Sequence, residues 1–448
     1  MDVVRIQSKF LVVSPTRVLH PAQLVVCRGR VVEITSSLSQ TADIDLGETV
    51  LFPGLVNAHT HLEFSSLASP FAAGASFPEW IARVVSYRRQ LSEAATSNPL
   101  ASSAEQRLEA TIAEGLCECF NSGTALLGDI VTPPWQPAVL PDAIGFRRLV
   151  KTAQTPWDGQ RGVLSSSSWQ THFAQISFPR VVAFAELLGL QIERMERSWQ
   201  WARGLFDQAG VGLLCDLGLS PHAPYSIHFP SLVQYLATDS RCVPLAMHLA
   251  ESPAELEWLQ GGRGPFKTMF QSLGIAIETP PPSIDQCISW LARQQRSLLI
   301  HGNYLTPAQI VQVAAARTIS VVFCPRTHAH FGHSSYPLTA MLDAGVSIVL
   351  ATDSRASNPN LSLWDEVVEV RRIAPQIPAS DLIDWVTVRP ARALGLEGDF
   401  GSLEIGRLAY ASALRAKPHW TAENLLEEMS RQSQAELDFR PLSNLLYS

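Results

Sequence analysis

The chain has 448 residues, of which 46% are hydrophobic and 17% charged, so it is long enough to bury a large core. Its net charge of −7, without a run rich in Lys or Arg, gives no electrostatic basis for binding nucleic acid. No apolar run approaches the roughly 20 residues that span a bilayer. Seven scattered cysteines without a disulfide framework are typical of a reducing compartment. We therefore expect a soluble, cytoplasmic protein that contacts neither nucleic acid nor membrane.

The two ends of the chain have a similar β-rich character. Residues 1–50 hold short β-branched runs separated by Pro, Gly or Ser turns, as in the strands of a small sheet. The stretch DFGSLEIGRLAYASAL, which begins at Asp399, again has the pattern of strands that return to such a sheet. We expect residues 1–50 and 400–448 to form one small β-sandwich domain from both chain ends. Residues 51–399 would form the other domain.

The central region alternates between short apolar runs and helical patterns. Helical stretches begin after Ser103, Ser283 and Thr306, which are suited to cap a helix N-terminus. Buried strands that alternate with helices indicate a parallel sheet, and eight of them predict an α/β protein with a (β/α)8 TIM-type barrel. A ninth run at 143–150 is assigned to an insertion within 132–178. The eight runs are 53–59, 124–131, 179–186, 211–222, 244–251, 297–303, 319–325 and 346–354.

Polar residues stand where these predicted strands end. In barrel enzymes the chemistry lies at that edge, where the strands pass into the following loops. His59 and His61 are two residues apart, so both can point to the same face of a strand. Isolated histidines are usually buried or solvated without a metal, but the repetition at successive strand ends favours one shared site. The residues in question are His59, His61, His222, His248, Glu251, His301 and Asp353.

The side chains at these ends suit a catalytic zinc ion. Such an ion takes three or more N/O ligands and leaves a position for water. If His248 binds the metal, Glu251 begins the loop just beyond it and can relay a proton to or from that water. A solvated glutamate in the first turn of a helix is the alternative interpretation of Glu251.

Five motifs together carry a family resemblance. PGLVNAHTHLE, SPHAPYSI, HLAE, LIHGNYL and ATDSRASNPNLSLWDE, in that order, resemble the amidohydrolase superfamily, and most closely its cytosine deaminase, chlorohydrolase and S-adenosylhomocysteine deaminase branch. The likeness covers about residues 3–415. It implies a distorted barrel that holds one divalent metal ion, usually zinc, beside a small β domain built from both chain ends. Iron is the other metal that we consider.

The resemblance also implies individual roles. Glu251 would be the proton shuttle, and His301 would orient and polarise the attacking water. Asp353 would help to deprotonate that water. His222, in SPHAPYS, and Trp80, in FPEWI, match positions that contact the substrate. The implied metal ligands are His59, His61, His248 and Asp353.

Two features depart from the family pattern. Some members bind two metals bridged by a modified lysine at the end of strand four, but Lys151 precedes that predicted strand, which favours one metal. In addition, Tyr410 stands where the closing motif usually has an aspartate. Since Tyr410 falls in the expected β domain, this difference concerns local structure rather than catalysis.

The stretch FCPRTHAHFGH at 323–333 contains three histidines, His328, His330 and His333. A second metal site is one interpretation. However, the implied ligands come from strands one, five and eight, so this stretch is interpreted as a loop at the mouth of the barrel. Arg326 and His330 are then candidate substrate contacts. The CPRTH variant, together with FAELLGL, is similar to a sub-branch that includes aminodeoxyfutalosine deaminases.

Three functions follow from these expectations. The first is a metal-dependent hydrolase that deaminates an amino-substituted N-heterocycle of adenine, guanine, pterin or aminodeoxyfutalosine type. A chlorohydrolase or amide-cleaving enzyme would use the same site with another leaving group. A non-catalytic metal-binding descendant would be expected to lose ligands, which this chain retains. The resemblance also suggests a homodimer as the assembly to test, because dimers are common among such relatives.

Overall fold

The structure is a computed structural model that describes residues 2–446 except for nine gaps. These gaps are 75, 97–102, 142–145, 147–159, 163, 209–214, 240, 276 and 278. The ninth apolar run at 143–150, save for Phe146, and Lys151 therefore lie outside the described residues.

Eight parallel strands form the centre of the molecule, in the order of the chain. A parallel bridge between Thr60 and Asp353 brings the first strand beside the segment that follows the last, so the sheet is nearly closed. The strands are almost wholly buried, as the near-continuous apolar runs predict. The predicted barrel is confirmed. Its strands are β8 (Leu55–Thr60), β9 (Thr124–Val131), β10 (Arg180–Leu187), β11 (Cys215–Pro221), β12 (Leu245–Leu249), β13 (Ser297–His301), β14 (Ile319–Phe323) and β15 (Ser347–Leu350).

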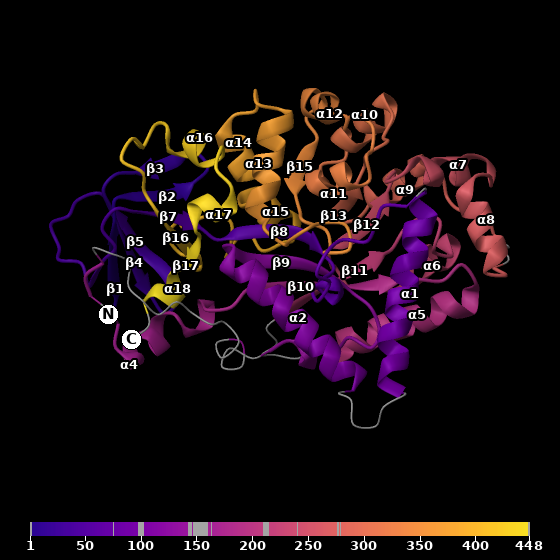
Figure 1. The fold of residues 1–448 in the computed structure, drawn as a ribbon, viewed down its shortest axis with the longest axis horizontal. Helices are drawn as coiled ribbons and strands as arrows, with labels where there is room; N and C mark the ends of the chain where they lie inside the picture. The colour runs from indigo at the N-terminus through magenta and orange to yellow at the C-terminus, as the bar shows by residue number, and fades with distance from the viewer. Residues whose placement is uncertain are drawn as a thin grey trace.

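Helices cover the outside of the strands (Figure 1). Ser103, Ser283 and Thr306 cap α2, α9 and α10, as predicted, and the structure adds that each forms a capping box with the glutamine three residues later. The helices around the barrel are α1 (Phe77–Thr96), α2 (Ala104–Asn121), α5 (Ile192–Gln208), α6 (Phe229–Thr238), α7 (Pro253–Gly261), α8 (Pro265–Ser272), α9 (Ile284–Leu291), α10 (Pro307–Ala315), α11 (Pro325–His330), α12 (Leu338–Ala344), α13 (Leu363–Ile373), α14 (Ala379–Asp384) and α15 (Val388–Ala393).

Two smaller sheets lie on one side of the barrel (Figure 1); one is formed by N-terminal strands alone, and the other combines strands from both chain ends. The link between the ends is β16 (Ala411–Arg415), which pairs antiparallel with β7 (Thr49–Pro53). The division at residues 50 and 400 stays a prediction. The first sheet contains β1 (Val4–Ser8), β4 (Ala22–Cys27), β5 (Arg30–Thr35) and β6 (Ile44–Asp45), and the second adds β2 (Phe10–Ser14), β3 (Arg17–Leu19) and β17 (Arg440–Pro441) to β7 and β16.

The Ser-rich segment before β10 contacts residues from both the N-terminal and the C-terminal part of the chain. Its short helix α4 (Ser166–His172) lies near both termini (Figure 1). Trp169 Nε1 donates to the carbonyl of Ser443 at 2.8 Å, and the Nδ1 of His172 accepts from the Arg28 amide at 3.0 Å. Tyr410 is buried nearby and donates to the carbonyl of Phe178 at 2.8 Å. Tyr410 thus contributes to the small sheets and their contact with this segment.

The seven cysteines are all unpaired. None of the helices among the described residues combines the length and the apolar character needed to cross a membrane.

Candidate active site

Three histidines meet at the carboxyl ends of the barrel strands. His59 lies near the end of β8, His61 directly follows that strand, and His248 lies on β12. One ligand nitrogen from each lies within 4.8 Å of the others, and all three residues are buried. Burial, followed by the neighbouring histidines, lowers the pKa of both His61 and His248 well below the usual value. These imidazoles are therefore neutral and offer lone pairs, so the three histidines form a site that can hold a metal ion.

Hydrogen bonding selects the ligand atom of His248. Its Nδ1 lies 3.1 Å from the backbone carbonyl oxygen of His222, so Nδ1–H donates there and Nε2 keeps the lone pair. Both ring nitrogens of His59 and the Nδ1 of His61 are buried without a hydrogen-bond partner among the described residues. Buried polar atoms normally have partners, and a bound cation would supply one.

Asp353 lies against this trio. Its Oδ1 is 3.6 Å from the Nε2 of His59 and 3.8 Å from that of His61. Burial alone would raise the pKa of Asp353, but attraction from His59 and His301 and the hydrogen bond from Ser357 outweigh it and lower the pKa. Asp353 is therefore an ionised carboxylate suited to a cation.

Glu251 and His301 form the second half of the site. The Nε2 of His301 lies 3.3 Å from the Oε1 of Glu251, and both side chains are buried. Burial, reinforced by the carboxylates of Asp353 and Glu255, raises the pKa of Glu251 well above its usual value. Burial lowers the pKa of His301. The contact therefore joins a neutral imidazole and a carboxylic acid, rather than two ions.

The backbone is strained at these strand ends. Ala250, His301 and Asp353 have φ angles of 54°, 68° and 57°, in the left-handed region that side chains rarely adopt. Such strain persists only where the surroundings fix it, and it clusters at functional sites. One fixing group is Glu255, whose carboxylate accepts from the amides of Ala250 and Glu251 at 3.2 and 2.7 Å. Glu255 therefore holds the turn that presents Glu251.

A cavity of about 840 Å³ opens above the histidines. Its wall includes His61, His248, Glu251, His301 and Asp353. Two predicted substrate contacts, Trp80 and His222, line it as well, and apolar side chains from α1 and α8 line its outer part. The structure thus brings the predicted catalytic residues and these two candidates into one cavity.

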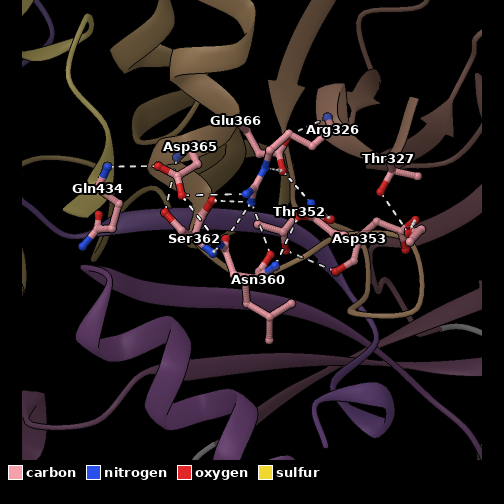
Figure 2. Close-up of polar contacts among 12 residues, drawn as sticks. Arg326, Thr327, Thr352, Asp353, Asn360, Ser362, Asp365, Glu366 and Gln434 are labelled. Carbon is pink, nitrogen blue, oxygen red and sulfur yellow. Dashed lines mark hydrogen bonds and ion pairs between the residues drawn. The ribbon is translucent and has the colours of Figure 1, made fainter. Parts of the chain in front are cut away.

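Arg326 does not line this cavity, which contradicts its predicted place. The segment 325–330 is the short helix α11 rather than a loop. The Nε of Arg326 donates to the buried Glu366 at 2.7 Å, and its Nη2 donates to the Oδ1 of Asn360 at 2.9 Å (Figure 2). The guanidinium is therefore used in holding the chain after β15, not in contacting a substrate.

The histidines of FCPRTHAHFGH also lie apart from the cavity wall. The described lining includes neither His328, His330 nor His333. Among the described residues, His59, His61 and His248 are the group whose ligand atoms meet closely enough for one ion, so a second metal here gains no support. The segment is linked to the site indirectly, through Ser357. The Thr327 hydroxyl lies 3.0 Å from the Ser357 hydroxyl, which donates to Asp353 at 2.9 Å.

Glu186 and Arg88 are cavity residues that the sequence did not point out. Glu186, near the end of β10, is buried, and burial raises its pKa to about 7 despite the opposing charge of Arg88. Arg88 comes from α1 and donates to both carboxylate oxygens of Glu63. The signal for Glu186 was present in FAELLGL, as a charged residue that ends a buried strand. Arg88 had none, because its place depends on how α1 packs.

The fold and this site define the class of protein. The profile of the Amidohydrolase family matches residues 50–434, so the chain belongs to that family and is one of its metal-dependent hydrolases. The expected resemblance is confirmed.

Deaminases are prominent among its relatives. The aminodeoxyfutalosine deaminase of Deinococcus radiodurans is 28% identical over 398 residues, which cover 85% of this chain and 82% of that protein. The 5-methylthioadenosine/S-adenosylhomocysteine deaminase of Syntrophobacter fumaroxidans is 24% identical over 432 residues, which cover 91% and 83%. The structure of Helicobacter pylori aminofutalosine deaminase in complex with methylthio-coformycin has a TM-score of 0.71 at 21% identity, over 96% of both chains.

Proposed function

We propose that this enzyme hydrolyses the exocyclic amino group of an adenine-type nucleoside and releases ammonia, with one divalent metal ion, zinc by preference. The observation that carries the proposal is the contrast between two neighbouring carboxyl groups. Burial and the nearby carboxylates raise the pKa of Glu251 and favour its protonated acid, whereas the surroundings of Asp353 lower its pKa and favour the ionised carboxylate. Two carboxyl groups whose pKa values are pushed apart are a recurrent basis for acid–base catalysis. The relatives that act on adenine nucleosides support the choice of substrate.

His59, His61, His248 and Asp353 would hold the metal, since their donor atoms converge and include buried nitrogens without partners. When bound, a divalent ion of this kind lowers the pKa of a water molecule and polarises it.

Glu251 supplies the proton that activates the substrate. Its carboxylic acid donates to the ring nitrogen beside the amino-bearing carbon, which makes that carbon more electrophilic. The adjacent His301 stays neutral and holds Glu251 at 3.3 Å, so the proton remains on the acid until a substrate accepts it.

Asp353 accepts a proton from the attacking water. Water oxygen then forms a bond to the ring carbon, and the carbon–nitrogen bond to the amino group breaks. The proton on Asp353 passes to the departing nitrogen, and the remaining proton of the attacking oxygen passes to Glu251. The amino compound and water thus give the carbonyl product and ammonia, and both carboxyl groups return to their starting states. The Ser357 hydroxyl bonds to Oδ2 of Asp353, which leaves Oδ1 on the side of the histidines.

Trp80 and His222 are proposed to contact the base and its substituent. Both line the cavity, and Trp80 stacks on Phe77 with ring centroids 5.8 Å apart. A rigid aromatic wall of this kind suits a planar ring. The volume of about 840 Å³ accommodates a substrate larger than a free base.

The test is ammonia release by the zinc-loaded enzyme from adenosine, 5′-methylthioadenosine, aminodeoxyfutalosine, guanine and a pterin. Chloride release from a chlorotriazine is measured in parallel. Ammonia from the adenine nucleosides supports the proposal. Chloride release without ammonia would instead favour the chlorohydrolase alternative.

A further inference from the structure

A polar cluster beside the metal ligands is not used by the chemistry proposed above. Glu186 is 2% exposed yet lines the cavity, and its Oε2 has no hydrogen-bond partner in the part of the chain that the structure describes. The Nε2 of His222 lies 4.0 Å from Oε1, and the Nη2 of Arg88 lies 3.8 Å from Oε2. Both separations exceed hydrogen-bond length. The carboxylate of Glu186 therefore keeps capacity to accept bonds from a ligand.

The tautomer of His222 follows from its neighbour. The hydroxyl of Ser226 donates to the carbonyl of Ala223 at 3.0 Å and lies 2.7 Å from the Nδ1 of His222. A hydroxyl carries one hydrogen, so Nδ1 must be the donor in that contact. In the neutral ring Nε2 is then an acceptor. Two acceptors, this Nε2 and the Oε1 of Glu186, thus face each other across 4.0 Å, and a ligand that contacts both has to present one hydrogen to each.

Arg88 adds a fixed donor on the other side of Glu186. Its Nε and Nη2 bond to the two carboxylate oxygens of Glu63 at 3.2 and 2.5 Å, which holds the guanidinium in place. An oxygen that binds beside Glu186 can therefore accept from Arg88 while its hydrogen goes to the carboxylate. Hydroxyl groups both donate and accept, and two on adjacent carbons can present one hydrogen to Glu186 and one to the Nε2 of His222.

We propose that Glu186, with His222 and Arg88, binds the vicinal hydroxyls of a ribose and makes the enzyme selective for ribonucleosides over free bases and deoxynucleosides. This inference rests on the proposed function and assigns the residues that would recognise the ribose of its substrates. The rings of His222 and His248 lie 5.0 Å apart, so the cluster is one side chain away from the metal ligands. In an adenine nucleoside the ribose lies across the purine from the reacting amino group, which suits this placement.

The first test needs only the unmodified, zinc-loaded enzyme. Values of kcat/KM are compared for adenosine, 2′-deoxyadenosine, 3′-deoxyadenosine and 2′,3′-dideoxyadenosine. We expect a preference of about 100-fold or more for adenosine over the dideoxy compound, because buried groups that bond a hydroxyl reject an analogue without it. Equal values for the four compounds would overturn the proposal.

The second test assigns the preference to Glu186. In Glu186→Gln the preference should fall below about tenfold, through loss of activity on the nucleosides that carry a ribose hydroxyl while activity on the dideoxy compound stays unchanged. The matched control is Glu193→Gln, which removes the same charge from an exposed position of α5 and should keep the preference. If Glu186→Gln keeps the full preference, or loses activity equally on all four nucleosides, Glu186 does not read the hydroxyls.

Calorimetry separates this inference from the proposed function. Inosine and 2′,3′-dideoxyinosine have no amino group to lose, so their binding to the zinc-loaded enzyme can be measured whatever reaction it catalyses. Tighter binding of inosine, abolished in Glu186→Gln, supports the hydroxyl site even if adenosine is not deaminated. Equal binding of the two compounds overturns the hydroxyl site even if adenosine is deaminated.

Discussion

Glu251 is the residue on which the proposed chemistry depends most. Replacing it with Gln keeps the shape but removes the transferable proton, so kcat should fall by about 10²–10⁴-fold, the usual contribution of a general acid. Zinc content should stay unchanged, since Glu251 is not a proposed ligand. The control is Glu257→Gln, an exposed glutamate on α7. Wild-type activity in Glu251→Gln would show that the acid has been assigned wrongly.

Asp129 leads to a prediction about how the free energy of unfolding depends on pH. It is buried on β9, and burial raises its pKa to about 8, although the Leu62 amide and Thr60 hydroxyl bond to it. The unfolded carboxyl titrates near 3.8. Between these values the folded state holds one proton more than the unfolded state, so this group's contribution to the free energy of unfolding falls by about 1.4 kcal/mol per unit as pH rises.

Asp129→Asn removes that titration while its amide oxygen can still accept both bonds. The variant should therefore gain free energy of unfolding relative to wild type as pH rises from 5 to about 8, where the gain levels off. Urea titrations at pH 5, 6.5 and 8 measure the difference. A constant difference across this range would show that Asp129 is ionised throughout in the folded protein.

At the scale of elements, helix α11 and the chain after β15 form one supporting unit. The Glu366 carboxylate accepts from Arg326 and from Asn358, and Asn358 in turn donates to the carbonyl of Thr352 at 2.8 Å. Arg326→Ala would leave Glu366 buried without its cation, which costs about 3–5 kcal/mol. We expect this loss of stability with little change in KM, since Arg326 does not line the cavity.

Chemical denaturation and steady-state kinetics measure both effects. Arg293→Ala, an exposed arginine, should change the free energy of unfolding by no more than about 0.5 kcal/mol. If Arg326→Ala raises KM without changing the free energy of unfolding, Arg326 contacts the substrate and does not support the fold.

The elements also show what the sequence could predict. Buried strands and capped helices depend on local patterns, so the barrel and the strand ends of His59, His248 and Asp353 were predictable. Helix α11 was missed because a six-residue helix has no room for a hydrophobic period, and its start at Pro325 also fits a loop. Arg326 and Glu366 are 40 residues apart, so the ion pair that removes Arg326 from the cavity depends on tertiary packing.

At the scale of the whole molecule, the metal should connect the strands as well as serve catalysis. The proposed ligands come from β8, β12 and the segment after β15, so a bound ion joins both sides of the barrel. At a free zinc concentration 100 times the Kd, binding adds about 2.7 kcal/mol. Chelation should lower Tm and abolish hydrolysis, and added zinc should restore both.

His59→Ala should show no shift of Tm with zinc, whereas His419→Ala, an exposed histidine, should shift as wild type does. A zinc-dependent shift retained in His59→Ala would place the ion elsewhere. The cytoplasmic location and the homodimer stay predictions from the sequence.

The most direct measurement follows both products of hydrolysis together. The zinc-loaded enzyme is incubated with an adenine nucleoside in water enriched in oxygen-18, and ammonia and the mass of the nucleoside product are recorded. We expect one ammonia per substrate consumed and one heavy oxygen in each product, with both formed about 10²–10⁴-fold more slowly by Glu251→Gln. Failure to release ammonia from any adenine nucleoside, while chloride is released from a chlorotriazine, would show that the enzyme is not a deaminase of adenine nucleosides.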